Sequence, residues 1–201
     1  MTDNLRAALG ADSDPEFSMM LPDGWVRMDA TEKSRDVVLA AAKVRLMAAH
    51  RPDLWAKVRA SMIAAFDGLI RSQGVALMMQ MESGDGVPFV PASITAAIQS
   101  AHGSSFDDYV AGLIARGAKP LGDDKRFIRQ ESRELVKQDG VQLGVTTIRY
   151  LTPIPGSRRK RALLLTAVLP HEANTPEDDP LLTSVRFSMD AHVSTLRWEP
   201  K

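Results

Sequence analysis

The stretch QDGVQLGVTTIRYL, residues 138–151, decides the fold of this chain. Asp139 and Gly140 form a dipeptide that is typical of tight hairpin turns, because both residues tolerate a positive φ. From Val141 onward, apolar side chains recur at every second position over several residues, and this period of two predicts a β-strand. The residues expected on one face of that strand are Val141, Leu143, Val145, Thr147, Arg149 and Leu151.

Two further strands flank this one and complete a predicted three-stranded meander over residues 126–169. Residues 127–136 run into the turn, and RALLLTAVLP, residues 161–170, returns after a longer tip that contains proline and glycine. Gly140 and Gly144 stand close together here, and a glycine inside a strand usually marks a bulge or close packing. We therefore expect an antiparallel sheet at the centre of the fold.

Two more strands are predicted upstream of the meander. VALMMQME, residues 75–82, is apolar along almost its whole length, which favours a strand that is covered on both faces. VPASITAAIQSA, residues 90–101, is also predicted as a strand, although its alanines leave a helix open. The glycine-containing turn SGDG, residues 83–86, separates the two.

Two helices are predicted between Thr31 and Arg71. Thr31 is a suitable N-cap, and the first helix ends near His50. Pro52 cannot continue a helix interior but suits the first turn of a second helix, which we expect Gly74 to close. The expected apolar stripes are Val37, Val38, Ala41, Val44 and Ala48 in the first helix and Leu54, Trp55, Val58, Met62, Ala65, Phe66, Leu69 and Ile70 in the second.

Two shorter helices follow along the chain. One is predicted over residues 104–116, and Gly117 is expected to end it. The last element is ambiguous, because its apolar residues alternate like a strand over part of its length and follow a helical stripe over a longer span. Asp179 and Pro180 supply an N-cap and first-turn pair, so we predict a helix over 180–194 with TLRW extended after it.

The opening of the chain, FSMMLPDGWV, indicates a tight turn between two short strands. Pro22 presets φ and Gly24 takes a positive φ without steric cost, so a hairpin or a strand corner fits. We expect Trp25 to fold back as a buried plug in the core.

Residues 1–15 are polar and are expected to be a flexible lead-in, which leaves a single α/β domain over 16–201. The predicted fold class is α+β, a mostly antiparallel β-sheet covered by helices in an α/β/α sandwich.

The composition is that of an ordinary globular protein. The 201 residues include 25 basic and 25 acidic side chains, so no overall field favours nucleic acid. The chain has no cysteine, which excludes disulfides, thiolate nucleophiles and cysteine-ligated zinc sites. The first residues do not form a secretory signal, and no apolar run approaches the about 18 residues of a membrane span. We therefore expect a cytoplasmic protein.

The order of elements resembles the PsbP-like α/β/α sandwich family. The likeness covers roughly residues 16–198, and in residues it rests on Leu21, Pro22, Gly24, Trp25 and the STLRW end. That family includes PsbP, a Ran-binding nuclear import factor and LpqN-type actinobacterial lipoproteins. This chain differs from the lipoproteins because it has no signal and no cysteine, so their envelope location is not implied. The resemblance implies a fold and a use in binding partners, but no catalytic residues.

No motif in the sequence carries a chemical reaction. The glycines do not form a phosphate-binding loop after a strand, and no Gly-x-Ser-x-Gly elbow is present. The histidines are scattered without metal-ligand spacing, and surface or helix-end positions explain them: His50, His102, His171 and His192. We therefore predict no catalytic, cofactor-binding or metal-binding residues and a protein that is not an enzyme.

One dense basic run, RRKR at residues 158–161, stands out. As a functional feature it predicts a patch for an acidic partner or for phosphate groups. As a structural feature it is a solvated hairpin tip whose charges discourage edge-to-edge sheet pairing. The candidate partner-binding residues are Arg158, Arg159, Lys160 and Arg161.

The chain is also rich in methionine, and these residues can be interpreted either as core packing or as the lining of an apolar groove. Met78, Met79 and Met81 cluster in one predicted strand, and Met19 and Met20 precede the opening turn. Flexible methionines fill cores, but they also line adaptable apolar grooves. We predict a non-enzymatic cytoplasmic binding or scaffold module that acts through protein–protein interaction, without a cofactor; its protein partner is not identified by the sequence, and an acidic one is the candidate that the basic run suggests. The alternative is a carrier of an apolar small molecule or lipid in a pocket between sheet and helices.

Overall fold

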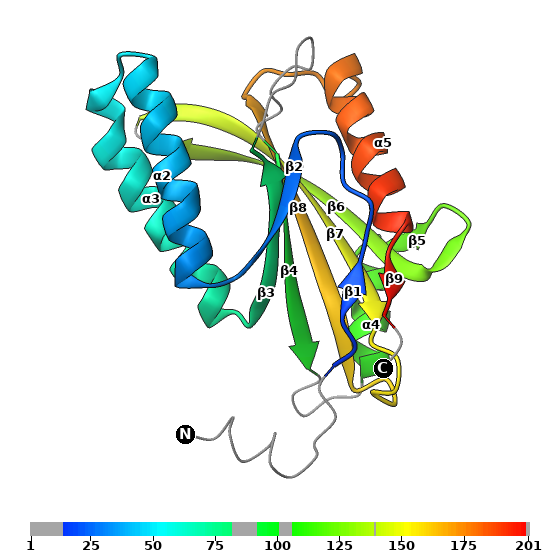
Figure 1. The fold of residues 1–201 in the computed structure, drawn as a ribbon. Helices are drawn as coiled ribbons and strands as arrows, with labels where there is room; N and C mark the ends of the chain where they lie inside the picture. Colours follow the sequence, from blue (N-terminus) through cyan, green and yellow to red (C-terminus); the bar gives the residue numbers. More distant parts are fainter. Residues whose placement is uncertain (1–13, 82–91, 101–105, 139, 200–201) are drawn as a thin grey trace, which may run out of the picture.

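The computed structural model describes residues 14–81, 92–100, 106–138 and 140–199, which form an α+β fold (Figure 1). Over these residues four helices surround a seven-stranded antiparallel sheet and a separate two-stranded sheet. In their order across the large sheet the strands are β2 (Trp25–Asp29), β3 (Gly74–Gln80), β4 (Ser93–Ser100), β8 (Arg161–Glu172), β7 (Val141–Pro153), β6 (Asp124–Gln138) and β5 (Lys119–Leu121). The predicted fold class is therefore confirmed.

The predicted meander is formed by β6, β7 and β8. Ile148 in the middle strand lies opposite Glu131 in β6 and Ala167 in β8. The six residues expected on one face of β7 do alternate together, but the main core lies against the other face. That face carries a row of buried side chains and one buried glycine: Gly144, Thr146, Ile148, Tyr150 and Thr152.

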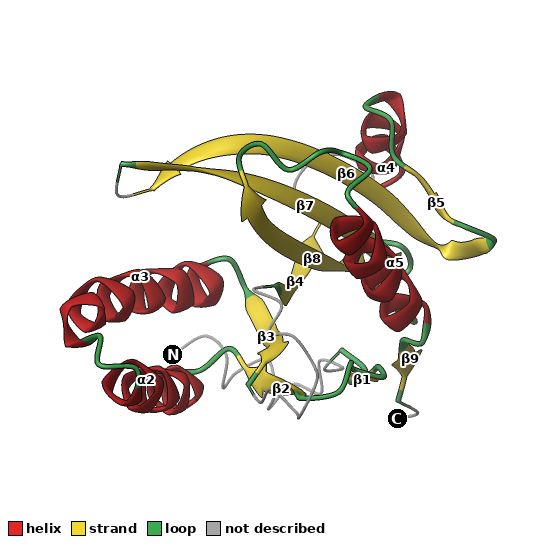
Figure 2. Ribbon diagram, turned by 90° about the horizontal axis from the view of Figure 1, so that it is seen from above, coloured by secondary structure: helices red, strands yellow, loops and turns green. Residues whose placement is uncertain are grey.

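The twisted sheet separates the helices into two groups (Figure 2). On one face α5 packs into the main core, where Met189 and Val193 join Ile148. On the other face α4 covers Leu151, and the α2–α3 pair lies beside β3. The helices are α2 (Glu32–Ala48), α3 (Pro52–Arg71), α4 (Phe106–Ala115) and α5 (Pro180–Ser194). Within the described ranges, none of these helices is long and apolar enough to cross a membrane.

Two predicted helix starts are confirmed in atomic detail. The Thr31 hydroxyl accepts a hydrogen bond from the backbone N–H of Ser34 at 3.2 Å, as an N-cap does. The Asp179 carboxylate accepts from the N–H of Leu182 at 2.9 Å, and Pro180 occupies the first turn of α5. The final segment is helical for this reason, and only its last residues are extended.

The opening turn is a strand corner. Gly24 has a φ of 75°, and the N–H of Trp25 donates to the carbonyl of Pro22 at 3.0 Å. The strand before the turn, β1 (Phe17–Ser18), pairs with β9 (Arg197–Trp198) near the other end of the chain, and the strand after it pairs with β3. The prediction that Trp25 is a buried plug is wrong: it is partly buried and packs against the margin of the core, because β2 is an edge strand.

Two details of the α2–α3 region differ from the prediction. The apolar stripe of α2 faces solvent in part, because α2 packs mainly on α3: Val38 is buried, but Val37 and Val44 are exposed. Gly74 does not close α3; it begins β3, and Gln73 takes the positive φ of 58° instead. A Cβ on Gly74 would lie 2.6 Å from the carbonyl oxygen of Leu69, so the glycine allows the close approach of helix and strand.

The prediction of close packing at a strand glycine is confirmed at Gly144. A Cβ at this position would lie 2.1 Å from Cε1 of His171 on the neighbouring strand β8. The imidazole therefore occupies the space above the glycine, where its Nε2 shares a hydrogen bond of 3.1 Å with the hydroxyl of Thr146. This arrangement makes His171 a packing residue.

Several predictions concern residues outside the described ranges. These are residues 1–13 of the expected lead-in, the turn at 83–86, the start of the third helix at 104–105, and Asp139 of the hairpin turn. The two described residues of the lead-in, Asp14 and Pro15, lie against the body of the protein: Asp14 pairs with Arg161.

Candidate functional site

The basic run falls on the hairpin tip that joins β7 to β8. Two successive tight turns build this tip, because the N–H of Ser157 donates to the carbonyl of Ile154 at 3.2 Å and the N–H of Lys160 donates to Ser157 at 3.0 Å. In the first turn Pro155 precedes Gly156, whose φ is 75°, which is the pattern of a type II turn. The sequence therefore reverses direction through a rigid Pro-Gly corner before the arginines begin.

The second turn has an unusual backbone. Arg158 and Arg159 have φ values of 51° and 58°, so two adjacent residues with long side chains are in the left-handed region. Two positive φ values between Ser157 and Lys160, together with the hydrogen bond that closes the turn, define a type I′ turn. Asn-Gly is the pair that such a turn prefers, because each residue tolerates left-handed backbone. The sequence shows the basic run but not this backbone geometry.

The structure keeps three of the four predicted residues together at the tip. Arg158 and Lys160 are exposed, and no described residue forms an ion pair with either. Arg159 lies 3.3 Å from Asp107, and both side chains are largely exposed, so this pair is weak. Arg161 does not belong to the tip: it begins β8, and its guanidinium group pairs with Asp14 at 2.7 Å. Arg161 is therefore removed from the candidate site.

An open cavity of about 440 Å³ lies beside the tip. Trp198 lines it, and the indole ring packs edge-on against Phe17 with 6.1 Å between ring centroids. Sequence reasoning did not connect Trp198 with the basic run, because pairing of β1 with β9 brings it there from a distant part of the chain. The complete lining is Arg126, Thr152, Pro153, Ile154, Pro155, Gly156, Arg158, Arg159 and Trp198.

Arg126 forms a fixed wall of this cavity. Its Nε and NH2 groups donate to the two carboxylate oxygens of Asp124 at 2.9 and 2.7 Å, and NH2 also donates to the carbonyl of Ser194 at 2.9 Å. The hydrogen bond from Arg126 holds the pKa of the Asp124 carboxyl below its usual value. Because Asp124 balances the charge of Arg126, the uncompensated positive charge of this region comes from Arg158 and Lys160, and in part from Arg159.

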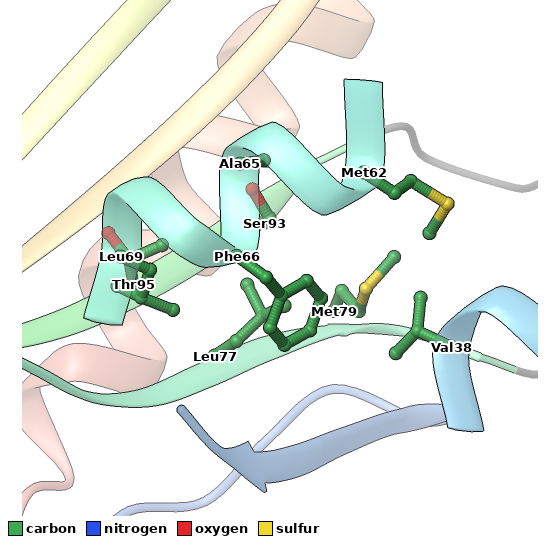
Figure 3. A pocket seen from close by; sticks show the side chains of 9 residues that line it. All are labelled: Val38, Met62, Ala65, Phe66, Leu69, Leu77, Met79, Ser93 and Thr95. Atoms are coloured by element: carbon green, nitrogen blue, oxygen red, sulfur yellow. The ribbon is translucent and has the colours of Figure 1, made fainter. Parts of the chain in front are cut away.

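A second pocket lies between α3 and the sheet and has a volume of about 220 Å³ (Figure 3). None of its lining residues is charged, and only two carry a hydroxyl group. The lining is Val38, Met62, Ala65, Phe66, Leu69, Leu77, Met79, Ser93 and Thr95. The expected methionine cluster is therefore divided: Met79 reaches this pocket, but Met78 is fully buried on the opposite face of the sheet and Met20 is exposed.

A partly buried chain of charged groups connects α5 to the sheet. The Tyr150 hydroxyl donates to the carboxylate of Asp190 at 2.6 Å, and the Nε of Arg129 donates to the same carboxylate at 2.8 Å. Arg129 and Arg186 both pair with Glu131, at 2.7 and 2.9 Å. Burial, together with the hydrogen bond to Asp190, raises the pKa of Tyr150 well above its usual value. The hydroxyl is thus kept protonated as a donor, and its role is to hold α5 in place.

The described residues contain no group of three or more His, Asp and Glu side chains that could hold a metal ion. His171 packs on Gly144, and His192 shares a hydrogen bond of 3.1 Å with the carbonyl of Met20. His50 lies in the turn that follows the first helix and has a φ of 54°. His102 lies outside the described residues. Local structure thus accounts for each of the three described histidines, without a role in metal binding or catalysis being needed.

Comparison with solved structures gives distant matches. No protein-family model matches the sequence, and no curated protein matches it. A crystal structure from Bacteroides thetaiotaomicron matches with 10% identity and a TM-score of 0.44; the match covers 92% of this chain but 46% of the other, so this chain spans just under half of that protein.

Two structures of Mog1 also match. The Saccharomyces cerevisiae Ran-binding protein Mog1p has 11% identity and a TM-score of 0.32 over 63% of this chain and 79% of its own. A point mutant of Mog1 has 12% identity and the same TM-score, over 61% of this chain and 78% of its own. The expected resemblance thus holds as a distant structural similarity to Mog1, and membership of the PsbP-like family stays a prediction.

Proposed function

We propose that this chain is a non-enzymatic binding module whose basic tip docks an acidic segment of another protein. The tip is defined as residues 157–160, and its charged members are Arg158, Arg159 and Lys160. The observation that carries the proposal is the left-handed backbone of two adjacent arginines.

Arginine is a costly choice at these two positions. A left-handed conformation costs a residue with a Cβ roughly 1–2 kcal/mol, and asparagine followed by glycine meets the same turn at lower cost. Strained backbone of this kind is concentrated at functional sites, where the gain in function offsets the loss in stability. Binding of a partner by the two guanidinium groups would explain why arginine occupies both positions of a strained turn.

The charge of the tip indicates what it binds. The chain as a whole is neutral, with 25 basic and 25 acidic residues, so its net charge attracts neither sign. At the tip three positive side chains follow one another, and within the described part of the chain their one ion pair is the weak contact of Arg159 with Asp107. A guanidinium group binds a carboxylate through two parallel hydrogen bonds, and positive charge accelerates encounter with a negative partner. An acidic protein segment fits this surface.

The cavity beside the tip supplies contacts other than charge. The ring of Trp198 offers an apolar wall, and aromatic and arginine side chains are the residues that most often dominate binding energy at interfaces. Arg126 is already fixed by Asp124, so little side-chain entropy is lost when a partner contacts it. We therefore expect the partner segment to place an apolar side chain next to its carboxylates.

Affinity capture from the native cell tests this proposal. The full chain is compared with a tip variant, Arg158→Gln, Arg159→Gln and Lys160→Gln, and with a control that loses three exposed lysines elsewhere, Lys33→Gln, Lys43→Gln and Lys137→Gln. All three proteins should fold, because every substituted side chain is exposed.

We expect the wild type and the control to retain the same acidic partner and the tip variant to lose at least about tenfold in affinity for it. Binding by the wild type should weaken as salt increases, because charge contacts near the surface are screened. Equal retention by the tip variant and the control would show that the tip is only a solvated hairpin.

A further inference from the structure

We propose that the pocket between α3 and the sheet is a second, separate binding site that takes a small, uncharged and mostly apolar molecule with one hydroxyl or carbonyl group. The site does not depend on the basic tip, which lies at the end of the β7–β8 hairpin. Three side chains from two elements form its apolar body: Phe66 and Leu69 from α3 and Leu77 from β3.

The size of the pocket sets the size of the occupant. Its volume of about 220 Å³ exceeds the about 150 Å³ of an engineered apolar cavity that admits benzene. A substituted ring or a short aliphatic chain therefore fits, and a two-chain lipid does not.

The lining also sets the charge of the occupant. Among the residues that the structure describes, no lysine, arginine, aspartate or glutamate lines the pocket, so a charged ligand would lose its hydration and gain no partner there. The hydroxyl of Thr95 is directed to the carbonyl of Thr166 at 3.5 Å, which is a long hydrogen bond. The hydroxyl of Ser93 makes no hydrogen bond with a described residue, so it can serve a polar group of the ligand.

The methionines give this site an adaptable wall. Met62 from α3 and Met79 from β3 lie at the end of the pocket near Val38 of α2 (Figure 3). A methionine side chain is unbranched and changes shape at low cost, so it adjusts to ligands of different outline. The NMR signals of the Met62 and Met79 methyl groups should therefore change when a molecule enters the pocket.

Methionine-methyl NMR on the full chain tests the proposal, with butanol, hexanol and octanol as probes. We expect saturable shifts of the Met62 and Met79 methyl signals, and no shift of the exposed Met20. Affinity should rise by about fourfold for each added methylene, the value for transfer of a methylene out of water. Hexanoate should bind at least about tenfold more weakly than hexanol, because its charge has no partner in the pocket.

Two adjacent alanines of α3 provide a matched pair of variants. Both alanines are exposed, but Ala65 lines the pocket and Ala64 does not. Ala65→Phe should lower the affinity for hexanol at least about tenfold, and Ala64→Phe should leave it unchanged. Circular dichroism reports whether each variant folds. If phenylalanine at position 65 unfolds the chain, Ala65→Leu is used in its place.

Three results would overturn the proposal: shifts of all methionine signals without saturation, equal binding of hexanol by the two alanine variants, or hexanoate bound as tightly as hexanol. The tip variant serves as the remaining control. It should bind hexanol with the same affinity as the wild type. The experiment on the tip and the experiment on the pocket can therefore fail independently of each other.

Discussion

Replacing Arg158 and Arg159 with Asn-Gly should make the protein more stable. Both arginines have positive φ, at 51° and 58°, in a turn that Asn-Gly adopts readily. Removing two left-handed residues with long side chains recovers roughly 2 kcal/mol. Part of this is offset, since glycine increases the conformational entropy of the unfolded chain by about 0.4–1 kcal/mol. The exposed contact of Arg159 with Asp107, which is also lost, contributes little.

The expected net gain is about 1 kcal/mol in the free energy of unfolding, or a rise of about 2–4 °C in Tm for a chain of this size. Urea and thermal unfolding measure both quantities. Arg158→Lys with Arg159→Lys is the control, because it keeps the charge and the strain and should leave stability unchanged. An Asn-Gly variant of equal or lower stability than the wild type would show that the turn is not strained, and would remove the main reason to assign it a function.

Two further predictions concern the core. Tyr150→Phe should cost about 1–3 kcal/mol, because Asp190 loses a hydrogen-bond donor in a buried position; urea unfolding measures this. The raised pKa of Tyr150 stabilises the folded state at pH values below the usual tyrosine value of about 10, and that contribution is lost as pH rises above it, so the wild type should lose more stability than Tyr150→Phe in alkaline solution. Gly144→Ala should cost about 1–3 kcal/mol, because the new Cβ displaces the ring of His171. Adding His171→Ala should restore part of that loss in the double variant, and an additive loss would contradict the packing explanation.

Local sequence patterns were sufficient to predict the central elements. The meander follows from alternation around an Asp-Gly turn, and the last helix follows from Asp179 and Pro180, whose cap geometry the structure confirms. These features depend on neighbours in the sequence, so a single sequence contains them.

Burial was harder to predict than the elements themselves. The periodicity of α2 indicates a helix, but it does not say that the helix packs on α3 and exposes Val37 and Val44. Trp25 was expected in the core because it is large and apolar, yet it lies on the edge strand β2. Position in the sheet depends on strand order, which one sequence does not contain.

In the candidate site, too, the features that depend on neighbouring residues were predictable and those that depend on distant residues were not. The density of charge predicted the tip, but the pairing of Arg161 with Asp14 and the presence of Trp198 both require contacts between distant segments. The pocket at α3 was expected only in outline, from the number of methionines. Its lining combines residues of α2, α3, β3 and β4, and no spacing along the chain connects them.

Site-specific photo-crosslinking in the native cell tests the central proposal most directly. A photoreactive residue is placed at Lys160 on the tip or, as a matched control, at Lys33 on α2; both positions are exposed lysines. We expect the tip probe to form an adduct with one protein, at a segment rich in aspartate or glutamate, and the α2 probe to form no such adduct. An adduct from the α2 probe alone, or adducts from both probes to the same mixture of proteins, would contradict the assignment of the tip as the docking surface.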